Sequence, residues 1–362
     1  MALTESLRFP PLSRILVISD IHGNLPYLKA LLEKLHFAGD DQLVIDGDFL
    51  EKGEHSLATL RFLMELKEKG NTHVICGNCD DWHLIFDPSW TWRAEEQTMQ
   101  YLIQKKRGLL WDMCNACGLD PFDLESFSAA KEVLREKFSR EFAFLAELPY
   151  AIETEHYIFT HAGMCPDKPL CQHSRKELNR CDALLKKDWS FDKWLIVGHW
   201  PVVLYGEDRV CANPILCREK KIISIDGGCV LKDDGQLNAL IIPFAGSEDF
   251  SFEAYDPFPV KTVLQEQQEG EHSYYIRWGD SRVQVLQRGE EFSLCRHVRT
   301  GYEMEILTRY LFCDSEFTDC NDCTDYILPL KAGDTVSVIE ETSRGYFVKH
   351  RGCSGWYYGE LK

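Results

Sequence analysis

The chain has 362 residues, of which 44% are hydrophobic, and this length and composition predict a globular protein of two or three domains. Its formal net charge of -18 argues against nucleic acid as a partner, because a phosphate backbone calls for a basic face. A small anionic substrate stays open, since bound metal ions would supply positive charge.

The sequence gives no sign of a membrane protein. No apolar run reaches membrane-spanning length, and the N-terminus has no basic segment followed by an apolar one. We therefore expect a cytoplasmic location and no membrane partner. The 15 cysteines are an odd number spread along the chain, and in a reducing cytosol they are expected to be free thiols.

Strands and helices alternate over the first 75 residues. Apolar runs at residues 14–19, 42–45 and 72–75 predict buried strands. Leucines at helical spacing predict helices over residues 25–35 and 56–69 between them. This alternation predicts right-handed βαβ units and a parallel sheet.

The pattern changes after the third strand. Residues 87–148 carry leucine, valine and phenylalanine at helical spacing, with a break at residues 118–121, and predict a helical insertion that covers one side of the sheet. Strand patterns then return, and the sheet is expected to continue through them. They lie at residues 157–159, 195–197, 222–225 and 237–243.

Beyond a polar and aromatic segment at residues 246–259, the pattern becomes all-β. Short alternating runs such as residues 283–286 lead to close-set strands separated by glycine turns, which predict a small antiparallel barrel. These strands lie at residues 335–339, 346–349 and 356–358. The predicted domains are residues 1–250 with the insertion, a β-rich connecting region at 251–301 and the barrel at 302–362.

Several potential metal ligands follow short apolar runs, each within two or three residues of a glycine. In chain order these blocks are Asp20-Ile21-His22-Gly23-Asn24, Gly47-Asp48, Gly77-Asn78, His161-Ala162-Gly163 and Gly198-His199. Two divalent cations about 3.5–4 Å apart can clamp a phosphoryl group and activate a water, and they need carboxylates, imidazoles and often an amide from several strand ends. One histidine alone is more often a core or surface residue, but the ordered set predicts a two-metal site.

These blocks resemble those of the calcineurin-like metallophosphoesterases. They are most similar to the PPP-type branch, which holds protein Ser/Thr phosphatases and bacterial diadenosine tetraphosphatases. The segment from Ser224 to Val230 resembles that branch's late strand and turn, and the resemblance covers about residues 14–242. It implies an α/β fold, a metallophosphoesterase sandwich of β-sheets flanked by helices.

The resemblance also implies the ligand roles. Asp20 and His22 would hold the first metal, and Asp48 would bridge both. The ligand set of the second metal would be completed by Asn78, His161 and His199. Pro201 stands where another branch places a further imidazole, which favours the PPP-type arrangement. The implied cofactors are two divalent metal ions, Mn²⁺ or Fe/Zn-type, because imidazole and carboxylate are mixed.

The chain departs from the family pattern at Cys79. PPP enzymes usually have histidine there, oriented by a following acid, and that histidine protonates the leaving oxygen. Here the residues are Cys79 and Asp80, and a thiol is a poor acid at neutral pH. Phosphodiesterase-like members share Gly-Asn-Cys-Asp, so we expect slow turnover of alkyl phosphomonoesters and better turnover of substrates with good leaving groups.

A second departure lies at Glu51-Lys52, where the family usually has Asp-Arg. Lys52 keeps the positive charge but loses the bidentate geometry with which arginine grips phosphate. The predicted catalytic residues are thus Asp48, Cys79, Asp80 and Lys52. The alternative for Lys52 is that its side chain points to solvent.

Three cysteine pairs have zinc-knuckle spacing, but they lie far apart in sequence, and a structural zinc needs two such pairs close together. They are Cys76 and Cys79, Cys114 and Cys117, and Cys320 and Cys323. We therefore expect no structural zinc. Redox sensitivity of Cys79 is a separate hypothesis.

The last 50 residues or so are similar to SH3 and bacterial SH3-like domains, with a first strand supplied by Arg309-Tyr310-Leu311. In SH3 domains, aromatic residues line a groove for extended proline-rich peptides. Tyr310, Tyr346, Trp356 and Tyr358 could form such a groove. The alternative is that these aromatic residues form the core of a small barrel.

The sequence therefore predicts a two-metal phosphoesterase, a phosphatase with phosphoserine or phosphothreonine proteins as first-choice substrates. One alternative is a dinucleoside polyphosphate hydrolase or phosphodiesterase, whose leaving groups tolerate the missing acid. Another is a non-catalytic protein that binds phosphate-containing ligands and recruits a partner through its SH3-like module.

Overall fold

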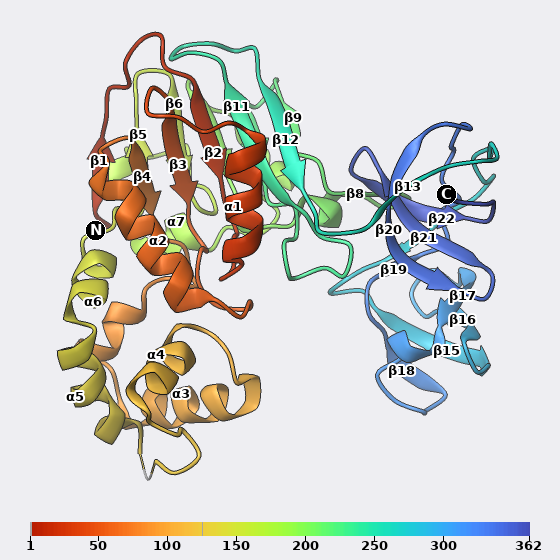
Figure 1. Ribbon diagram of the computed structural model, residues 1–362, viewed down its shortest axis with the longest axis horizontal. Helices are drawn as coiled ribbons and strands as arrows, with labels where there is room; N and C mark the ends of the chain where they lie inside the picture. Colours follow the sequence, from red (N-terminus) through yellow and green to blue (C-terminus); the bar gives the residue numbers. More distant parts are fainter. Residues whose placement is uncertain (1, 125) are drawn as a thin grey trace. The chain divides into compact units, whose positions relative to one another are not determined.

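The computed structural model describes residues 2–124 and 126–362 (Figure 1). The chain folds into two compact units. Unit 1 comprises the residues up to 200 together with 214–231 and 236–255, and unit 2 comprises residues 201–213, 232–235 and 256–362. The predicted boundaries at residues 250 and 301 stay predictions.

Unit 1 is built on two β-sheets. The first has the order β12-β11-β2-β3-β4, in which β2, β3 and β4 run parallel and β11 is antiparallel to β2. Its strands are Ser251–Tyr255, Leu237–Ile242, Ile15–Ile18, Gln42–Asp46 and Thr72–Ile75 in that order. The strands predicted at the start of the chain are therefore present, and they form one sheet.

The second sheet has the order β1-β5-β6-β7-β10-β9, with β6, β7 and β10 parallel. Its strands are Thr4–Ser6, Ala151–Glu153, Tyr157–Thr160, Trp194–Val197, Ile222–Ser224 and Ile215–Cys217. The prediction that the first sheet continues through residues 157–225 is wrong, because these strands pair with one another instead. A buried strand has the same continuous apolar sequence in either sheet, so the apolar pattern could not distinguish one long sheet from two separate sheets.

Alternate residues of each strand face opposite ways, and both faces are buried. Val17 and Val44 pack with Phe159 and Ile196 in a core shared by the two sheets. Their strand neighbours, such as Leu16, belong to a second core that includes the helices. Burial on both faces explains why these strands read as continuous apolar runs.

Helices cover the first sheet and fill the insertion. In Figure 1, α1 (Leu25–Lys34) and α2 (Ser56–Glu68) lie along the face of β2, β3 and β4. The insertion holds η1 (Trp82–Phe86), α3 (Trp92–Lys105), α4 (Leu109–Cys117), α5 (Phe127–Lys137) and α6 (Ser139–Ala146). The expected break follows α4, which ends at Gly118 in a left-handed conformation with φ of 71°. Shorter helical turns follow at η2 (Leu170–Gln172), α7 (Arg175–Asn179) and η3 (Leu184–Lys186).

Unit 2 contains three sheets, so an all-β region is present at the C-terminal end. A five-stranded sheet has the order β13-β20-β21-β22-β8, a four-stranded sheet β17-β16-β15-β18, and β14 pairs with β19. The first is formed by Val260–Thr262, Thr335–Thr342, Gly345–His350, Cys353–Tyr357 and Val210–Cys211. The second is formed by Glu303–Leu307, Phe292–His297, Arg282–Gln287 and Phe317–Asp319, and the pair by Tyr275–Ile276 and Cys323–Thr324.

The first strand expected at Arg309-Tyr310-Leu311 is wrong. Residues Thr308–Tyr310 form a 3-10 turn (η5), and the strand positions beside β20 and β22 are taken by β13 and β8. These partners come from segments far away in the sequence, where a local pattern gives no sign of the pairing. SH3-like identity stays a prediction.

Across the described part of the chain, every helix is too short or too polar to span a bilayer.

Candidate metal centre

The predicted ligands lie where β2, β3, β4, β6 and β7 end. Backbone hydrogen bonds tie the following loops together. The His22 N–H donates to the Asp48 carbonyl at 2.9 Å, and the Gly198 N–H donates to the His161 carbonyl at 2.8 Å. The carboxyl ends of parallel strands form one edge of a sheet, which is the usual place for a site in an α/β fold.

The backbone is left-handed at four of the predicted ligands. The φ angles are 54° at Asp20, 49° at His22, 48° at Asp48 and 66° at His199. Non-glycine residues rarely adopt this conformation, and those that do cluster at functional sites, where the surrounding structure holds them. The loops therefore direct these side chains at a cost in local conformational energy.

Gly77 shows how closely the loops approach one another. A Cβ atom at this position would collide with the backbone nitrogen and a carboxylate oxygen of Asp48. Only glycine allows the loop after β4 to pass against Asp48, and this contact brings Asn78 and Cys79 to the site.

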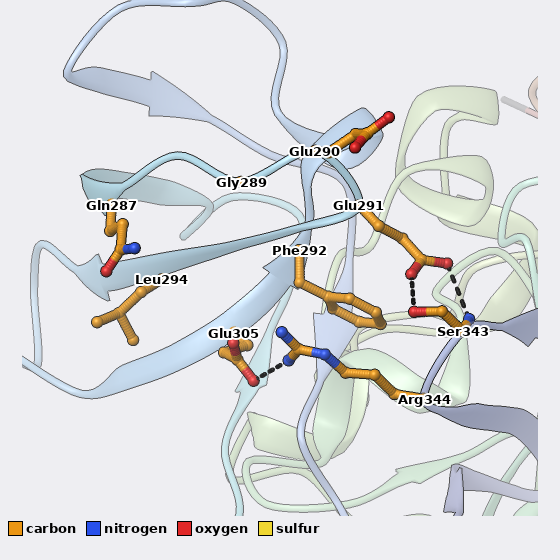
Figure 2. Close-up of a pocket in the computed structure, with 9 residues that line it drawn as sticks. All are labelled: Gln287, Gly289, Glu290, Glu291, Phe292, Leu294, Glu305, Ser343 and Arg344. Carbon is orange, nitrogen blue, oxygen red and sulfur yellow. Dashed lines mark hydrogen bonds and ion pairs between the residues drawn. The ribbon is translucent and has the colours of Figure 1, made fainter.

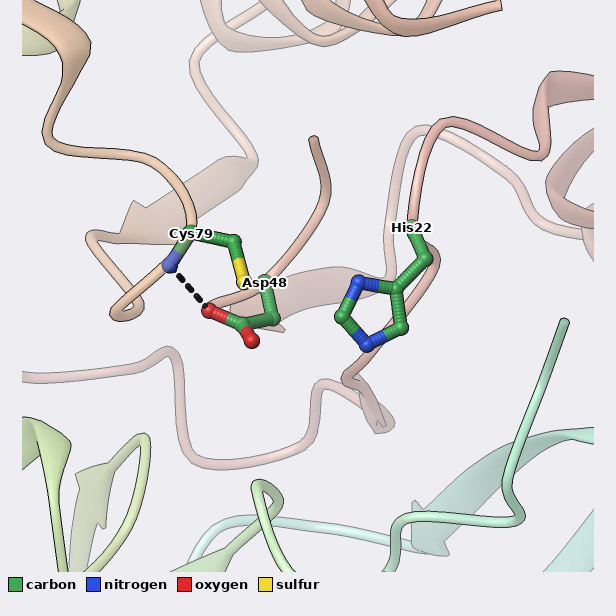
Figure 3. Close-up of side chains that lie close together, drawn as sticks. All are labelled: His22, Asp48 and Cys79. Carbon is green, nitrogen blue, oxygen red and sulfur yellow. Dashed lines mark hydrogen bonds between the residues drawn. The ribbon is translucent and has the colours of Figure 1, made fainter. Parts of the chain in front are cut away.

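Asp48 lies at the centre of the ligand set. Two groups of potential ligand atoms each fall within 4.8 Å of one another, one from Asp20, Asp48 and His161, the other from His22, Asp48 and Cys79 (Figure 3). His161 Nε2 is 3.2 Å from Asp48 Oδ1, and His22 Nε2 is 3.8 Å from Asp20 Oδ1. A shared carboxylate between two clusters is what a bridging ligand requires.

The two remaining predicted ligands lie at the edge of this set. The His199 ring is 5.2 Å from the His161 ring, and the His199 N–H donates to Asp20 Oδ2 at 3.0 Å. Its Nε2 lies 3.0 Å from the carboxylate of Asp182. Asn78 is partly buried, and its side-chain amide donates to Cys79 Sγ at 3.2 Å.

The residues fit a pair of cations, because buried ligand atoms point inward without partners. Among the residues that the structure describes, three such atoms have no hydrogen-bond partner, namely Asp20 Oδ1, His22 Nε2 and Asn78 Oδ1, and His161 Nε2 faces the Asp48 carboxylate at 3.2 Å. The other ring nitrogens are engaged. His22 Nδ1 lies 3.3 Å from the Leu50 carbonyl, and His161 Nδ1 lies 3.0 Å from the Asp46 carbonyl. Backbone contacts of this kind orient an imidazole so that Nε2 faces a metal.

The electrostatics of the site also suit cations. Burial lowers the pKa of His22 to about 4, which keeps its ring neutral and able to bind metal. Burial and the Asp226 carboxylate raise the pKa of Asp20. Burial raises the pKa of Asp48 as well, but the charge and hydrogen bond of His161 outweigh this and leave it lowered. Divalent cations would relieve the repulsion among these carboxylates.

The four predicted catalytic residues have different surroundings. The Cys79 N–H donates to Asp48 Oδ1 at 2.8 Å, and burial together with the Asp48 charge raises the pKa of the Cys79 thiol. The Asp80 carboxylate accepts the Leu50 N–H at 3.0 Å and the Gly77 N–H at 2.8 Å. Asp80 thus ties two loops together rather than orienting Cys79. Lys52 is partly exposed, and its charge is among the causes that lower the pKa of His22, so its ammonium group lies within electrostatic reach of the site.

Three further carboxylates at the site are not among the predicted site residues. Asp226 is fully buried, and its charge raises the pKa of Asp20. Asp182 lies in a loop, and its carboxylate contacts His199 Nε2. Glu51 is buried, and its carboxylate accepts the Leu109 N–H at 2.8 Å and the Tyr101 hydroxyl at 2.7 Å. Asp226 follows an apolar strand, a signal that could have found it, whereas no local pattern marks Asp182.

Glu51 links the loop that follows Asp48 to the helical insertion. Glu51→Ala would leave the Leu109 N–H unpaired, so we expect a loss of about 1–3 kcal/mol in the free energy of unfolding. Glu51→Gln keeps an acceptor oxygen and should lose less. Urea unfolding and limited proteolysis of residues 87–148 would measure both, with exposed Glu54→Ala as the matched control. Equal stability of Glu51→Ala and Glu54→Ala would contradict this role.

The burial of Asp46 should make the free energy of unfolding depend on pH. Both of its carboxyl oxygens lack hydrogen-bond partners in the described chain, and burial raises its pKa to about 7. An unfolded aspartate ionises near pH 3.9, so between about pH 4 and 7 the folded state binds more protons than the unfolded state. The contribution of Asp46 to stability is therefore complete below about pH 4 and is lost as the pH rises to about 7.

Asp46→Asn cannot ionise and should lack this decline. Relative to wild type, the free energy of unfolding of the metal-free variant should rise between pH 4 and pH 8, by roughly 4 kcal/mol at most. Urea titrations at several pH values would measure the difference. Parallel pH profiles for the two proteins would contradict the prediction.

The aromatic residues predicted to form a peptide groove in unit 2 do not share one face. The Trp356 and Tyr358 rings are stacked with an interplanar angle of 8°, and Phe347 lies 5.4 Å from Trp356. Tyr346 pairs with Tyr357 across the strands and packs against the core. The Tyr310 hydroxyl instead donates to Glu340 at 3.2 Å.

A hollow of about 740 Å³ in unit 2 is lined in part by Phe292, Glu305 and Arg344, and the Phe292 ring lies 5.8 Å from the Trp356 ring (Figure 2). The Arg344 guanidinium group lies 4.5 Å from the centre of the Phe292 ring and pairs with Glu305. Peptide binding by unit 2 stays a prediction.

Both groups of three or more closely spaced histidine, cysteine or acidic side chains found in the described residues lie at the unit 1 site. Buried carboxylates and imidazoles that share one central aspartate, at the strand ends of an α/β sandwich, define the class of dinuclear metal-dependent hydrolases.

Residues 13–226 match the calcineurin-like phosphoesterase family, and the chain belongs to that family. It is therefore a phosphoester hydrolase, and members of this family use a dinuclear metal centre.

Two curated relatives agree with this assignment. The chain is 26% identical over 257 residues to the symmetrical bis(5'-nucleosyl)-tetraphosphatase of Vibrio campbellii, covering 59% of this chain and 90% of that protein. It is 25% identical over 247 residues to the asymmetrical bis(5'-nucleosyl)-tetraphosphatase PrpE of Bacillus velezensis, covering 59% and 84%. A protein serine/threonine phosphatase structure from Saccharomyces cerevisiae aligns with a TM-score of 0.44 and 11% identity over 71% of this chain and 84% of that one.

Proposed function

We propose that the chain hydrolyses dinucleoside polyphosphates, by attack of water on a phosphoanhydride bond. The predicted ligands would hold the two cations. They are Asp20, His22, Asp48, Asn78, His161 and His199. The two bis(5'-nucleosyl)-tetraphosphatases support this substrate class over the phosphoprotein substrates predicted first, because each is similar to this chain over more than four fifths of its own length.

The observation that carries the choice of substrate is Cys79. A partly buried thiol whose pKa is raised by its surroundings is a poor general acid for a leaving oxygen at neutral pH. An alkoxide leaving group needs that proton, whereas a nucleoside phosphate leaves as a stable anion without it. The site is therefore suited to anhydrides rather than to phosphoserine esters.

The chain's own residues would position the substrate. The bound cations would neutralise phosphoryl charge and lower the pKa of a water. Lys52 would contact a phosphate group of the substrate from the exposed side, as a point charge without a fixed geometry. Asp80 and Gly77 hold the loop that carries Asn78 against Asp48.

A substrate panel tests the proposal. Metal-reconstituted protein would be assayed with diadenosine tetraphosphate, p-nitrophenyl phosphate and a phosphoserine peptide, over several divalent metals. We expect the highest kcat/KM for diadenosine tetraphosphate and the lowest for the peptide. Products also distinguish the two modes of cleavage, because symmetrical cleavage yields two ADP and asymmetrical cleavage yields ATP and AMP.

Two outcomes would overturn the proposal. A higher kcat/KM for the phosphopeptide would restore the protein-phosphatase hypothesis. Binding of diadenosine tetraphosphate without hydrolysis of any substrate would instead favour the non-catalytic hypothesis.

A further inference from the structure

We infer that Cys79 is itself a metal ligand, and that its sulfur joins His22 and Asp48 around the first metal position. This inference rests on the proposed metal centre and adds a residue to it. The sequence assigned Cys79 only a substrate-handling role, as the replacement for an acid. The structure gives it a position among the ligands instead.

The distances fit a shared ion. Cys79 Sγ, a His22 ring nitrogen and an Asp48 carboxylate oxygen all lie within 4.8 Å of one another (Figure 3). Bonds of about 2.0–2.3 Å around a tetrahedral zinc place its ligand atoms about 3.6 Å apart. Small side-chain movements would therefore bring the three atoms onto one ion.

A second observation points into the same space. His22 is 1% exposed, and its Nε2 has no hydrogen-bond partner within the described chain. An orphaned buried nitrogen costs free energy unless something binds it. A cation between His22 and Asp48 would satisfy this nitrogen, and Cys79 lines the same space.

The coordination numbers also leave a place for Cys79. The proposed assignment gives the second metal four protein ligands but the first only three, Asp20, His22 and Asp48. Cys79 would complete the first position. Its backbone N–H already donates to Asp48 Oδ1 at 2.8 Å, and the Asn78 amide donates to Sγ at 3.2 Å, so both backbone and sulfur are held.

A thiolate ligand would set the choice of metal. Sulfur prefers Zn²⁺, Fe²⁺ and Co²⁺ over Mg²⁺ and Mn²⁺, whereas a set of oxygen and nitrogen ligands accepts Mn²⁺ readily. Binding would release the thiol proton to solvent. The first position should therefore select a thiophilic ion. The competing arrangement is a protonated thiol that only donates a hydrogen bond to Asp48.

Cobalt spectroscopy distinguishes the two arrangements. Wild-type protein loaded with two equivalents of Co²⁺ should show an intense near-ultraviolet thiolate-to-cobalt charge-transfer band beside the weaker visible d–d bands. Cys79→Ser should lose the charge-transfer band and keep the d–d bands. Cys76→Ala, which removes a buried thiol three residues away, should keep both.

Each outcome has a separate meaning. Visible d–d bands and hydrolysis of diadenosine tetraphosphate without a charge-transfer band would overturn the role of Cys79 and leave the proposed function standing. Failure of the wild type to bind Co²⁺ would overturn both. A charge-transfer band that persists in Cys79→Ser would assign the sulfur to another cysteine.

X-ray absorption on the zinc-loaded wild type provides a test that needs no variant. A sulfur shell at about 2.3 Å is expected, and scattering from nitrogen and oxygen alone at about 2.0–2.1 Å would contradict the inference.

Discussion

Asp48→Asn should reduce kcat for diadenosine tetraphosphate by at least about 10²–10³-fold. Asp48 belongs to both ligand groups of the site, so its replacement weakens both metal positions at once. An amide of the same shape offers one neutral oxygen where the carboxylate offers two charged ones. Metal analysis of the purified variant should show fewer than two ions per chain.

Asp182→Asn is the matched control. Its carboxylate also contacts the site, at His199 Nε2, but its side chain is 69% exposed and belongs to neither ligand group. We expect the control to retain two metals and most of the activity. Equal losses in the two variants would show that Asp48 is not a bridge.

Cys79→His should raise the hydrolysis of alkyl phosphomonoesters, by up to about 10²-fold, because an imidazole can protonate the leaving oxygen. Hydrolysis of p-nitrophenyl phosphate should rise much less, since its leaving group needs no proton. The ratio of the two rates reports proton donation, because an imidazole that only replaced sulfur as a ligand would change both rates together.

Cys79→Ser is the comparison for this experiment, because it removes the sulfur and supplies no acid. Its alkyl phosphomonoesterase rate should not rise. An unchanged ratio of alkyl to p-nitrophenyl rates in Cys79→His would contradict the argument that the missing acid determines the substrate class.

The strands of unit 1 could be predicted because they are buried on both faces and therefore appear in the sequence as continuous apolar runs. The same property hid their partners, since a strand such as Trp194–Val197 carries no mark of the sheet to which it belongs. Pairing of Val210–Cys211 with Cys353–Tyr357 was also invisible, because more than 140 residues separate the two strands.

The gathering of the six predicted ligands at strand ends could be predicted, because each of these residues follows a strand close to a glycine. Side chains whose role depends on contacts with residues distant in the sequence are not marked by any local pattern. Glu51 was judged only as a replacement for the family's aspartate, and its contacts with Tyr101 and Leu109 depend on how the insertion folds back. Cys79 was judged as a missing acid, and its nearness to His22 became visible only in three dimensions.

The most direct test of the central claim is the rate of diadenosine tetraphosphate hydrolysis as metal is added back to stripped protein. The rate should be negligible without metal and should rise until two equivalents of Zn²⁺, Fe²⁺ or Mn²⁺ are bound per chain. A rate that does not depend on metal, or no hydrolysis at two bound equivalents of any of these ions, would contradict a dinuclear site acting on phosphoanhydrides.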